Sequence, residues 1–155
     1  QLAQRYGVDC QIKWPNDLYS TQGKWGGILV EPLNAHQAVV GVGLNVLPLP
    51  KQGIDQATSS LTELGLSEFN RIQLTAELYL AIQQAGEWFS HGCTNLAARF
   101  NHYAAFKNQM VEFEHLQGLT TGTFLGIRND GAIEIQQQGE VKHFFQGRLR
   151  LKSKA

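Results

Sequence analysis

The sequence has few of the residues that mark several classes of protein. It contains only two cysteines, Cys10 and Cys93, and they form no Cys-x-x-Cys motif. This spacing favours two reduced thiols in a reducing compartment over a disulfide. No apolar run is long enough to span a bilayer, and no signal peptide is visible. The formal net charge is zero, so no long-range field attracts nucleic acid or an anionic membrane. We therefore expect a cytoplasmic protein, and DNA binding is not supported by this chain.

Other chemical signatures are missing as well. The five histidines show no metal-ligand spacing, and no Ser-His-Asp or Cys-His set occurs. What the chain does have is enough apolar residues to form a core, since 43% are hydrophobic and 10% are aromatic. Its length suits one medium domain, or two small ones.

Periodicity and capping residues predict three helices in the middle of the chain. Asn70 begins the longest one, which ends at Gly92. Residues 96–103 predict another short helix. The sequence Ser60-Leu61-Thr62-Glu63 is typical of a capping box, and predicts a short helix that ends at Gly65.

Strands are predicted on both sides of these helices. Residues 18–20 and 24–31 form a hairpin around a Thr-Gln-Gly turn. Residues 38–46 are almost continuously apolar, which is typical of a strand buried on both faces. After Asn108 the strands become short and closely spaced, as in a small antiparallel barrel. We expect a domain boundary near Lys107. The strands predicted after it are 110–114, 118–127, 132–137 and 141–145.

The most informative segment combines cations, an Asn-Asp pair and two glycines. It reads Lys13-Trp14-Pro15-Asn16-Asp17-Leu18 and continues with Lys24-Trp25-Gly26-Gly27-Ile28-Leu29-Val30-Glu31. Two successive glycines weaken a strand, and so indicate close approach by a ligand or another backbone. A lysine beside bare N–H groups is a plausible oxyanion or phosphate site. The structural alternatives are a simple β-bulge for the glycines and an ordinary turn for Asn16-Asp17.

Two further segments are ambiguous. Gly41-Val42-Gly43-Leu44-Asn45 lacks the third glycine and the following helix of a dinucleotide loop. Its glycines leave room for a flat ligand and Asn45 could present an amide to a heterocycle, although a tightly packed strand explains the same pattern. The basic residues near the C-terminus fit either a solvated edge strand or a phosphate contact. These residues are Arg148, Arg150, Lys152 and Lys154.

Taken together, these segments resemble the biotin protein ligases in order and spacing. The resemblance implies that Lys24 is the essential lysine between the biotin carboxylate and the α-phosphate of ATP. Biotin would also be bound by the backbone of Gly27 and Ile28, over a pocket floor formed by Gly41 and Gly43. The residues implied at ATP are Lys13, Asn16, Asp17, Asn45 and Lys152, with Asp17 also at Mg²⁺.

The resemblance also implies a fold. We expect an α+β chain in which residues 1–107 are the second half of a class II synthetase-like catalytic domain, with a mixed sheet and helices on one face. Residues 108–155 resemble the SH3-like C-terminal barrel of the family. The family's glycine- and arginine-rich loop precedes the first motif and is absent here. We therefore expect this chain to be an incomplete, inactive fragment.

The implied reaction forms biotinyl-5′-AMP from ATP and biotin, with Mg²⁺, and transfers biotin to a lysine of a carboxylase's biotin carboxyl carrier domain. A homodimer is a further possibility. Two alternatives stay open: a lipoate protein ligase, which shares this chemistry, and a non-catalytic ligand-binding or interaction fragment.

Overall fold

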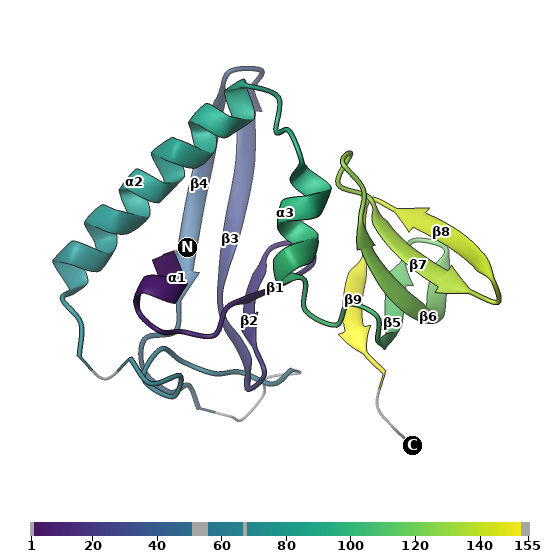
Figure 1. Cartoon of the computed structure of the whole chain (residues 1–155), viewed down its shortest axis with the longest axis horizontal. Coiled ribbons are helices and arrows are strands. Elements are labelled where there is room, and N and C mark those ends of the chain that lie inside the picture. Colours follow the sequence, from purple (N-terminus) through teal and green to yellow (C-terminus); the bar gives the residue numbers. More distant parts are fainter. Residues whose placement is uncertain (1, 51–55, 67, 153–155) are drawn as a thin grey trace. The chain divides into compact units, whose positions relative to one another are not determined.

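The computed structural model describes residues 2–50, 56–66 and 68–152, and Figure 1 shows its elements. The chain divides into two units. The first comprises Gln1–Gln11 and Asn16–Cys93, and the second comprises Ile12–Pro15 and Thr94–Ala155. Lys107, where we place a domain boundary, lies within the second unit, and that boundary stays a prediction. In the described segments, no helix combines the length and apolar character needed to cross a membrane.

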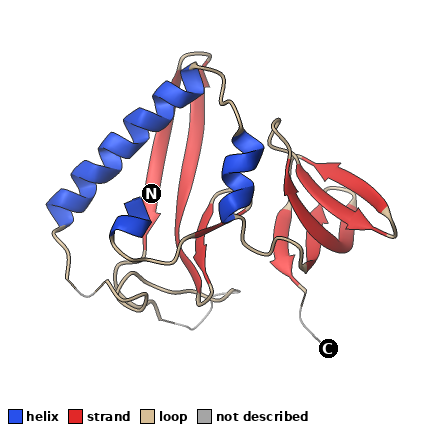
Figure 2. Cartoon of the chain, in the orientation of Figure 1, coloured by secondary structure: helices blue, strands red, loops and turns tan. Residues whose placement is uncertain are grey.

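Both units combine helices with antiparallel strands (Figure 2), so the α+β class is correct. The first sheet has the order β1-β2-β3-β4. These strands are β1 (Gln11–Lys13), β2 (Asp17–Ser20), β3 (Gly23–Asn34) and β4 (Gln37–Leu44). We expected a mixed sheet, but β2, β3 and β4 pair antiparallel. Parallel pairing occurs at two isolated bridges of the described residues.

The predicted hairpin forms because the residues of its turn stabilise the turn themselves. The Ser20 hydroxyl donates to the Gly23 carbonyl, and accepts from the backbone N–H of Gln22. Gly23 adopts φ +130°, a conformation open almost only to glycine. The hairpin between residues 18–20 and 24–31 is therefore confirmed.

The core of the first unit is small. Its buried members are Val8, Trp25, Leu61, Leu66 and Leu74. The prediction that residues 38–46 are buried on both faces is wrong, since most side chains of β4 are exposed. The physical reason is that little of this strand is covered: in the described residues, Leu44 is the one β4 side chain that packs on the core cluster. An apolar run predicts burial only where another layer covers it.

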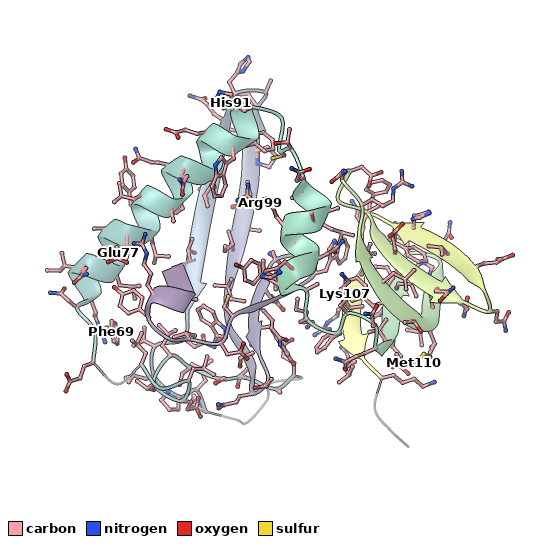
Figure 3. The ribbon with its side chains drawn as sticks, viewed as in Figure 1. Phe69, Glu77, His91, Arg99, Lys107 and Met110 are labelled. Atoms are coloured by element: carbon pink, nitrogen blue, oxygen red, sulfur yellow. The ribbon has the colours of Figure 1, made fainter. Side chains whose placement is uncertain are left out.

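Helix α2 (Arg71–Ser90) confirms the predicted longest helix. The Asn70 side chain caps it by accepting from the N–H groups of Ile72 and Gln73. His91 lies at its other end (Figure 3), where its ring nitrogen Nδ1 approaches the Glu87 carbonyl at 2.7 Å. Leu74 is its buried residue, whereas Ile72, Phe89 and other apolar side chains are exposed.

The short helix predicted after Ser60 is replaced by a turn. The expected capping contact does form, because the Ser60 hydroxyl donates to Glu63 at 2.8 Å and accepts from its N–H at 3.4 Å. The chain leaves the helical path at Gly65, where φ is +96°. The capping residues therefore organise a single turn that does not continue into a helix.

A four-residue helix, α1 (Leu2–Arg5), begins the described part of this unit.

The second unit has one helix and an antiparallel sheet with the order β8-β7-β6-β5-β9. Helix α3 (Leu96–Tyr103) matches its predicted range. The strands are β5 (Met110–His115), β6 (Gly118–Ile127), β7 (Ile133–Gln137), β8 (Glu140–Phe144) and β9 (Arg148–Leu151). We expected a small antiparallel barrel. In the described residues β8 and β9 remain unpaired edges of one sheet, so closure is not found.

Trp14 belongs to the core of this second unit. It is 6% exposed and packs edge-on against Phe113, with ring centroids 5.6 Å apart. Its indole N–H donates to the Gly131 carbonyl at 3.2 Å. The first sequence motif is therefore divided: Lys13 and Trp14 are part of the second unit, whereas Asn16 and Asp17 are part of the first.

Candidate functional site

An ion pair between Lys24 and Asp17 is the centre of the candidate site in the first unit. The ammonium Nζ lies 2.7 Å from Asp17 Oδ1, and the two side chains are 32% and 16% exposed. Asp17 pairs across the hairpin with Gly27. The ammonium is thus held at a partly shielded carboxylate, beside a residue with no side chain. This arrangement fixes a compact positive charge where an anionic ligand can approach.

A β-bulge places Lys24 on this face of the sheet. Lys24 and Gly27 are three residues apart, so regular alternation would send their side chains to opposite faces. The register shifts between Leu18 and Tyr19 and leaves Trp25 as the extra residue on β3. Trp25 turns into the core and donates its indole N–H to the Tyr19 carbonyl at 3.1 Å. The predicted structural alternative for the glycine pair was a β-bulge. A bulge is present next to the pair, at Trp25, and it turns the Lys24 side chain to the face of Gly27.

Glycines form an open surface beside the ion pair. Gly27 pairs with Gly43 on β4, and Gly41 pairs with Leu29. A Cβ atom at Gly41 or Gly43 would meet nothing within 4 Å. A Cβ at Gly27 would lie 3.7 Å from Asp17 Oδ1 and 3.8 Å from Lys24 Cε. These glycines therefore leave space on the face that carries Lys24 and Asp17. Gly26 is different, because its Cβ would be 2.7 Å from the Gly43 carbonyl oxygen.

The two asparagines implied at the nucleotide brace the backbone of this site. Asn16 Nδ2 donates to the Ile28 carbonyl at 2.9 Å, and the Ile28 N–H donates to the Asn16 carbonyl at 3.0 Å. Asn45 Nδ2 donates to the carbonyls of Lys24 at 3.3 Å and Ser59 at 3.1 Å. Both amides thus fix strand positions around Lys24. Their roles at phosphate and adenine stay predictions, as does the role of the Ile28 backbone at biotin.

The remaining predicted residues lie elsewhere. Lys13 is buried and Lys152 is exposed, and both belong to the second unit. Lys152 follows β9, where its N–H donates to the Met110 carbonyl at 3.1 Å. Lys154 lies outside the described residues. The approach of these lysines to a nucleotide stays a prediction.

Sequence reasoning missed Tyr19, which shares this face with Asp17. The two residues are two apart on β2, so their side chains point to the same side. Burial, and then the charge of Asp17, raise the pKa of the Tyr19 phenol above its ordinary value. The sequence did contain a signal for Tyr19. In the strand Asp17-Leu18-Tyr19, successive side chains alternate between faces, so once Leu18 is assigned to the core, Asp17 and Tyr19 lie together on the other face.

This shift predicts how stability depends on pH. A raised folded-state pKa means that the folded protein holds the phenol proton more tightly than the unfolded chain does. The resulting stabilisation is complete below about pH 10, the ordinary tyrosine pKa, and is lost as pH rises through the folded value. We expect Tyr19→Phe to lose less stability than wild type between pH 9 and pH 11, measured by urea unfolding. An equal loss in both proteins would contradict this assignment.

Whether this site could hold magnesium depends on the oxygen ligands that its residues provide. Among the described residues, no three His, Cys, Asp or Glu side chains converge as a metal site. Asp17 is the carboxylate of the Lys24 ion pair. One carboxylate together with substrate phosphates is a common way to bind Mg²⁺, and does not need an all-protein cage. The residues present therefore fit a metal that arrives with a nucleotide.

Comparison with known proteins places this geometry in a family context. Residues 2–45 match the Biotin/lipoate A/B protein ligase family. The bifunctional ligase/repressor BirA of Salmonella typhimurium is 30% identical over 99% of this chain and 50% of its own length. BirA of Escherichia coli has the same identity and coverage. The chain thus spans about half the length of these curated relatives.

Solved structures agree on the fold. Biotin protein ligase from Aquifex aeolicus, in complex with biotin and ATP, superposes with a TM-score of 0.83 at 22% identity. The match covers 99% of this chain and 66% of that one. The matched sequences include the segments that bring Lys24, Asp17 and the glycines together. Over nearly its whole length, this chain is therefore similar in sequence to about half the length of the BirA ligases, and in fold to solved biotin protein ligases.

Proposed function

We propose that this chain is part of an ATP-dependent ligase that forms biotinyl-5′-AMP and transfers biotin to a lysine of a carboxylase carrier domain. In the first step the biotin carboxylate attacks the α-phosphorus of ATP and pyrophosphate leaves. In the second the acceptor amine attacks the mixed anhydride and AMP leaves. The observation that carries the proposal is the Lys24–Asp17 pair beside the glycine surface.

Charge explains why this arrangement suits the reaction. A carboxylate and a triphosphate repel each other, and negative charge builds on the phosphoryl oxygens as the new bond forms. An ammonium held between them offsets both effects. Asp17 supports this role because it holds Lys24 Nζ at 2.7 Å. Bound Mg²⁺, held by Asp17 and the phosphates, would supply further charge neutralisation.

We assign the other residues by the same reasoning. Gly27, Gly41 and Gly43 form the floor for biotin, beside Ile28, because a flat ligand can approach their backbone closely. By the family resemblance, we propose Asn16 and Lys13 at the phosphates, Asn45 at adenine, and Lys152 at the nucleotide. We further propose that the first unit is the second half of a class II synthetase-like catalytic domain, and that the second unit includes the SH3-like domain.

Adenylate formation is the direct test. The full-length protein, meaning the whole ligase of which we propose this chain is part, is incubated with biotin and ATP labelled at the α-phosphate. Biotinyl-AMP is then separated from AMP. We expect labelled biotinyl-AMP, and unlabelled lipoate is not expected to compete with biotin. Labelled lipoyl-AMP in place of biotinyl-AMP would favour a lipoate ligase, which the matched family also includes. The absence of any adenylate from full-length protein would leave only a ligand-binding role.

The glycine floor gives a sharper prediction. Gly43→Val adds a branched side chain in open space, so we expect stability within about 1 kcal/mol of wild type. The new atoms would occupy the face beside Gly27 and weaken biotin binding by about 10-fold or more. Isothermal titration calorimetry in the full-length protein measures this change. Gly86→Ala on α2, where a Cβ also meets nothing within 4 Å, is the control and should bind biotin normally. Normal biotin binding by Gly43→Val would show that biotin does not lie over these glycines.

A further inference from the structure

A short segment at residues 56–61 runs beside β3 at the position of Lys24. The Lys24 N–H donates to the Ala57 carbonyl at 2.9 Å, and the Ser59 N–H donates to the Lys24 carbonyl at 2.8 Å. These two bonds define a parallel bridge between Lys24 and Thr58. The segment thus lies along one edge of β3 at Lys24, and β2 lies along the other edge, where Tyr19 pairs with Lys24.

This segment is held in place at several points. Asn45 Nδ2 donates to the carbonyls of both Lys24 and Ser59. The Leu61 N–H donates to the Asn45 carbonyl at 2.8 Å. Gly23 allows the two backbones to approach closely, since a Cβ there would lie 2.6 Å from the Ala57 carbonyl carbon and oxygen. The positions of residues 57–59 are therefore fixed relative to Lys24.

The bridge determines where the side chains of this segment point. Bridged residues share a face of a sheet, and successive residues alternate. Thr58 therefore lies on the face of Lys24 and Asp17, and is half-buried. Ser59 lies on the opposite face, where it is 3% exposed and its hydroxyl has no hydrogen-bond partner among the described residues. In the described part of the chain, no side-chain hydrogen bond involves Thr58.

We propose that the Thr58 hydroxyl is a further ligand-binding group of this site, donating a hydrogen bond to the anionic substrate oxygen that Lys24 also contacts. This inference rests on the proposed function, and adds a residue that neither the motifs nor the family resemblance pointed to. A threonine hydroxyl can donate to a carboxylate or a phosphate oxygen. Its β-branched side chain has few rotamers on a strand, so little freedom is lost on binding. Lys24 and Thr58 then form two converging donors, fixed by one bridge.

The test removes the hydroxyl while keeping the shape. We expect Thr58→Val, and also Thr58→Ala, to weaken binding of one anionic substrate by about 10-fold to 100-fold, the range for a hydrogen bond to a charged group. Thr58→Ser keeps the hydroxyl and should bind within about 2-fold of wild type. Calorimetric titration of the full-length protein with biotin alone, and with ATP alone, identifies which oxygen Thr58 contacts. Thr121→Val, at a half-buried threonine of β6, is the matched control and should bind both ligands normally.

The outcomes separate this inference from the proposed function. If wild type and all variants bind neither biotin nor ATP, the proposed function fails, and this inference with it. If wild type binds and Lys24→Ala weakens binding while Thr58→Val and Thr58→Ala match wild type, only the role of Thr58 is overturned. If Thr58→Ser, which keeps the hydroxyl, loses as much affinity as Thr58→Val, the hydroxyl does not account for binding, which also overturns it. Circular dichroism and urea unfolding of each variant confirm that folding is retained.

Discussion

Replacing Lys24 with alanine in the full-length protein should lower the rate of biotinyl-adenylate formation by about 10²–10³-fold, or about 2.7–4 kcal/mol in activation free energy. The reason is that the ammonium stabilises charge that develops only as the carboxylate reaches the phosphorus. Its removal also takes away the ammonium that now lies 2.7 Å from the Asp17 carboxylate, so two anionic substrates would approach this carboxylate without it. Release of labelled pyrophosphate at saturating biotin and ATP measures the rate.

Two variants control for the loss of a lysine. Lys142→Ala removes an ammonium that bonds Gln137 on the second unit's sheet, and should leave the rate unchanged. Lys24→Arg keeps the charge but replaces a compact ammonium by a planar guanidinium, which is a poor substitute where a point charge is required. We expect its rate to fall between those of Lys24→Ala and wild type. Near-normal pyrophosphate release by Lys24→Ala would remove this residue from the mechanism.

Gly23→Ala should produce the largest loss of stability among the glycine variants considered. At φ +130°, a residue with a side chain is strained by about 1–3 kcal/mol. The added Cβ would also lie 2.6 Å from the Ala57 carbonyl and 2.8 Å from the Thr58 nitrogen, and backbone atoms cannot rotate away. With the cost of overpacking included, we expect a loss of about 2–4 kcal/mol in the free energy of unfolding.

Urea unfolding of Gly23→Ala and Gly41→Ala tests this prediction. Gly41 also lies in a strand, but its φ is not positive, and a Cβ there meets nothing within 4 Å. We expect Gly41→Ala to be as stable as wild type or slightly more stable. Equal stabilities of the two variants would show that Gly23 can accept a side chain and that residues 57–59 do not approach β3 as closely as the structure shows.

Local signals in the sequence were sufficient for much of the fold. Asn70 satisfies the first N–H groups of α2 with its own side chain, so its helix start could be predicted without knowledge of the rest of the molecule. The turn before Gly23 depends on equally local chemistry, through the Ser20 hydroxyl. The helix Leu96–Tyr103 was also predicted, although its Ala97 N–H donates to the distant Asn129 side chain. At the site, the motif placed Lys24, Asp17 and the glycines in one short stretch, and the hairpin brings them together.

Features that depend on distant partners could not be predicted. The apolar run of β4 indicated burial, but exposure is set by what packs on the strand and not by its composition. Trp14 looked like part of a ligand motif, yet its partners Phe113 and Gly131 lie about a hundred residues away. Thr58 has no distinctive neighbours in sequence. Its position became visible only through the bridge to Lys24.

The extra residue at Trp25 limits how this protein can change during evolution. At the present length, a strand without the bulge would alternate regularly, and the ammonium would be carried to the side now filled by the indole ring. With one residue more or fewer, the lysine would share a face with Gly27 only if the bulge were absent. Among natural relatives, we therefore expect a change in the length of Lys24–Gly27 to occur only together with loss of the bulge.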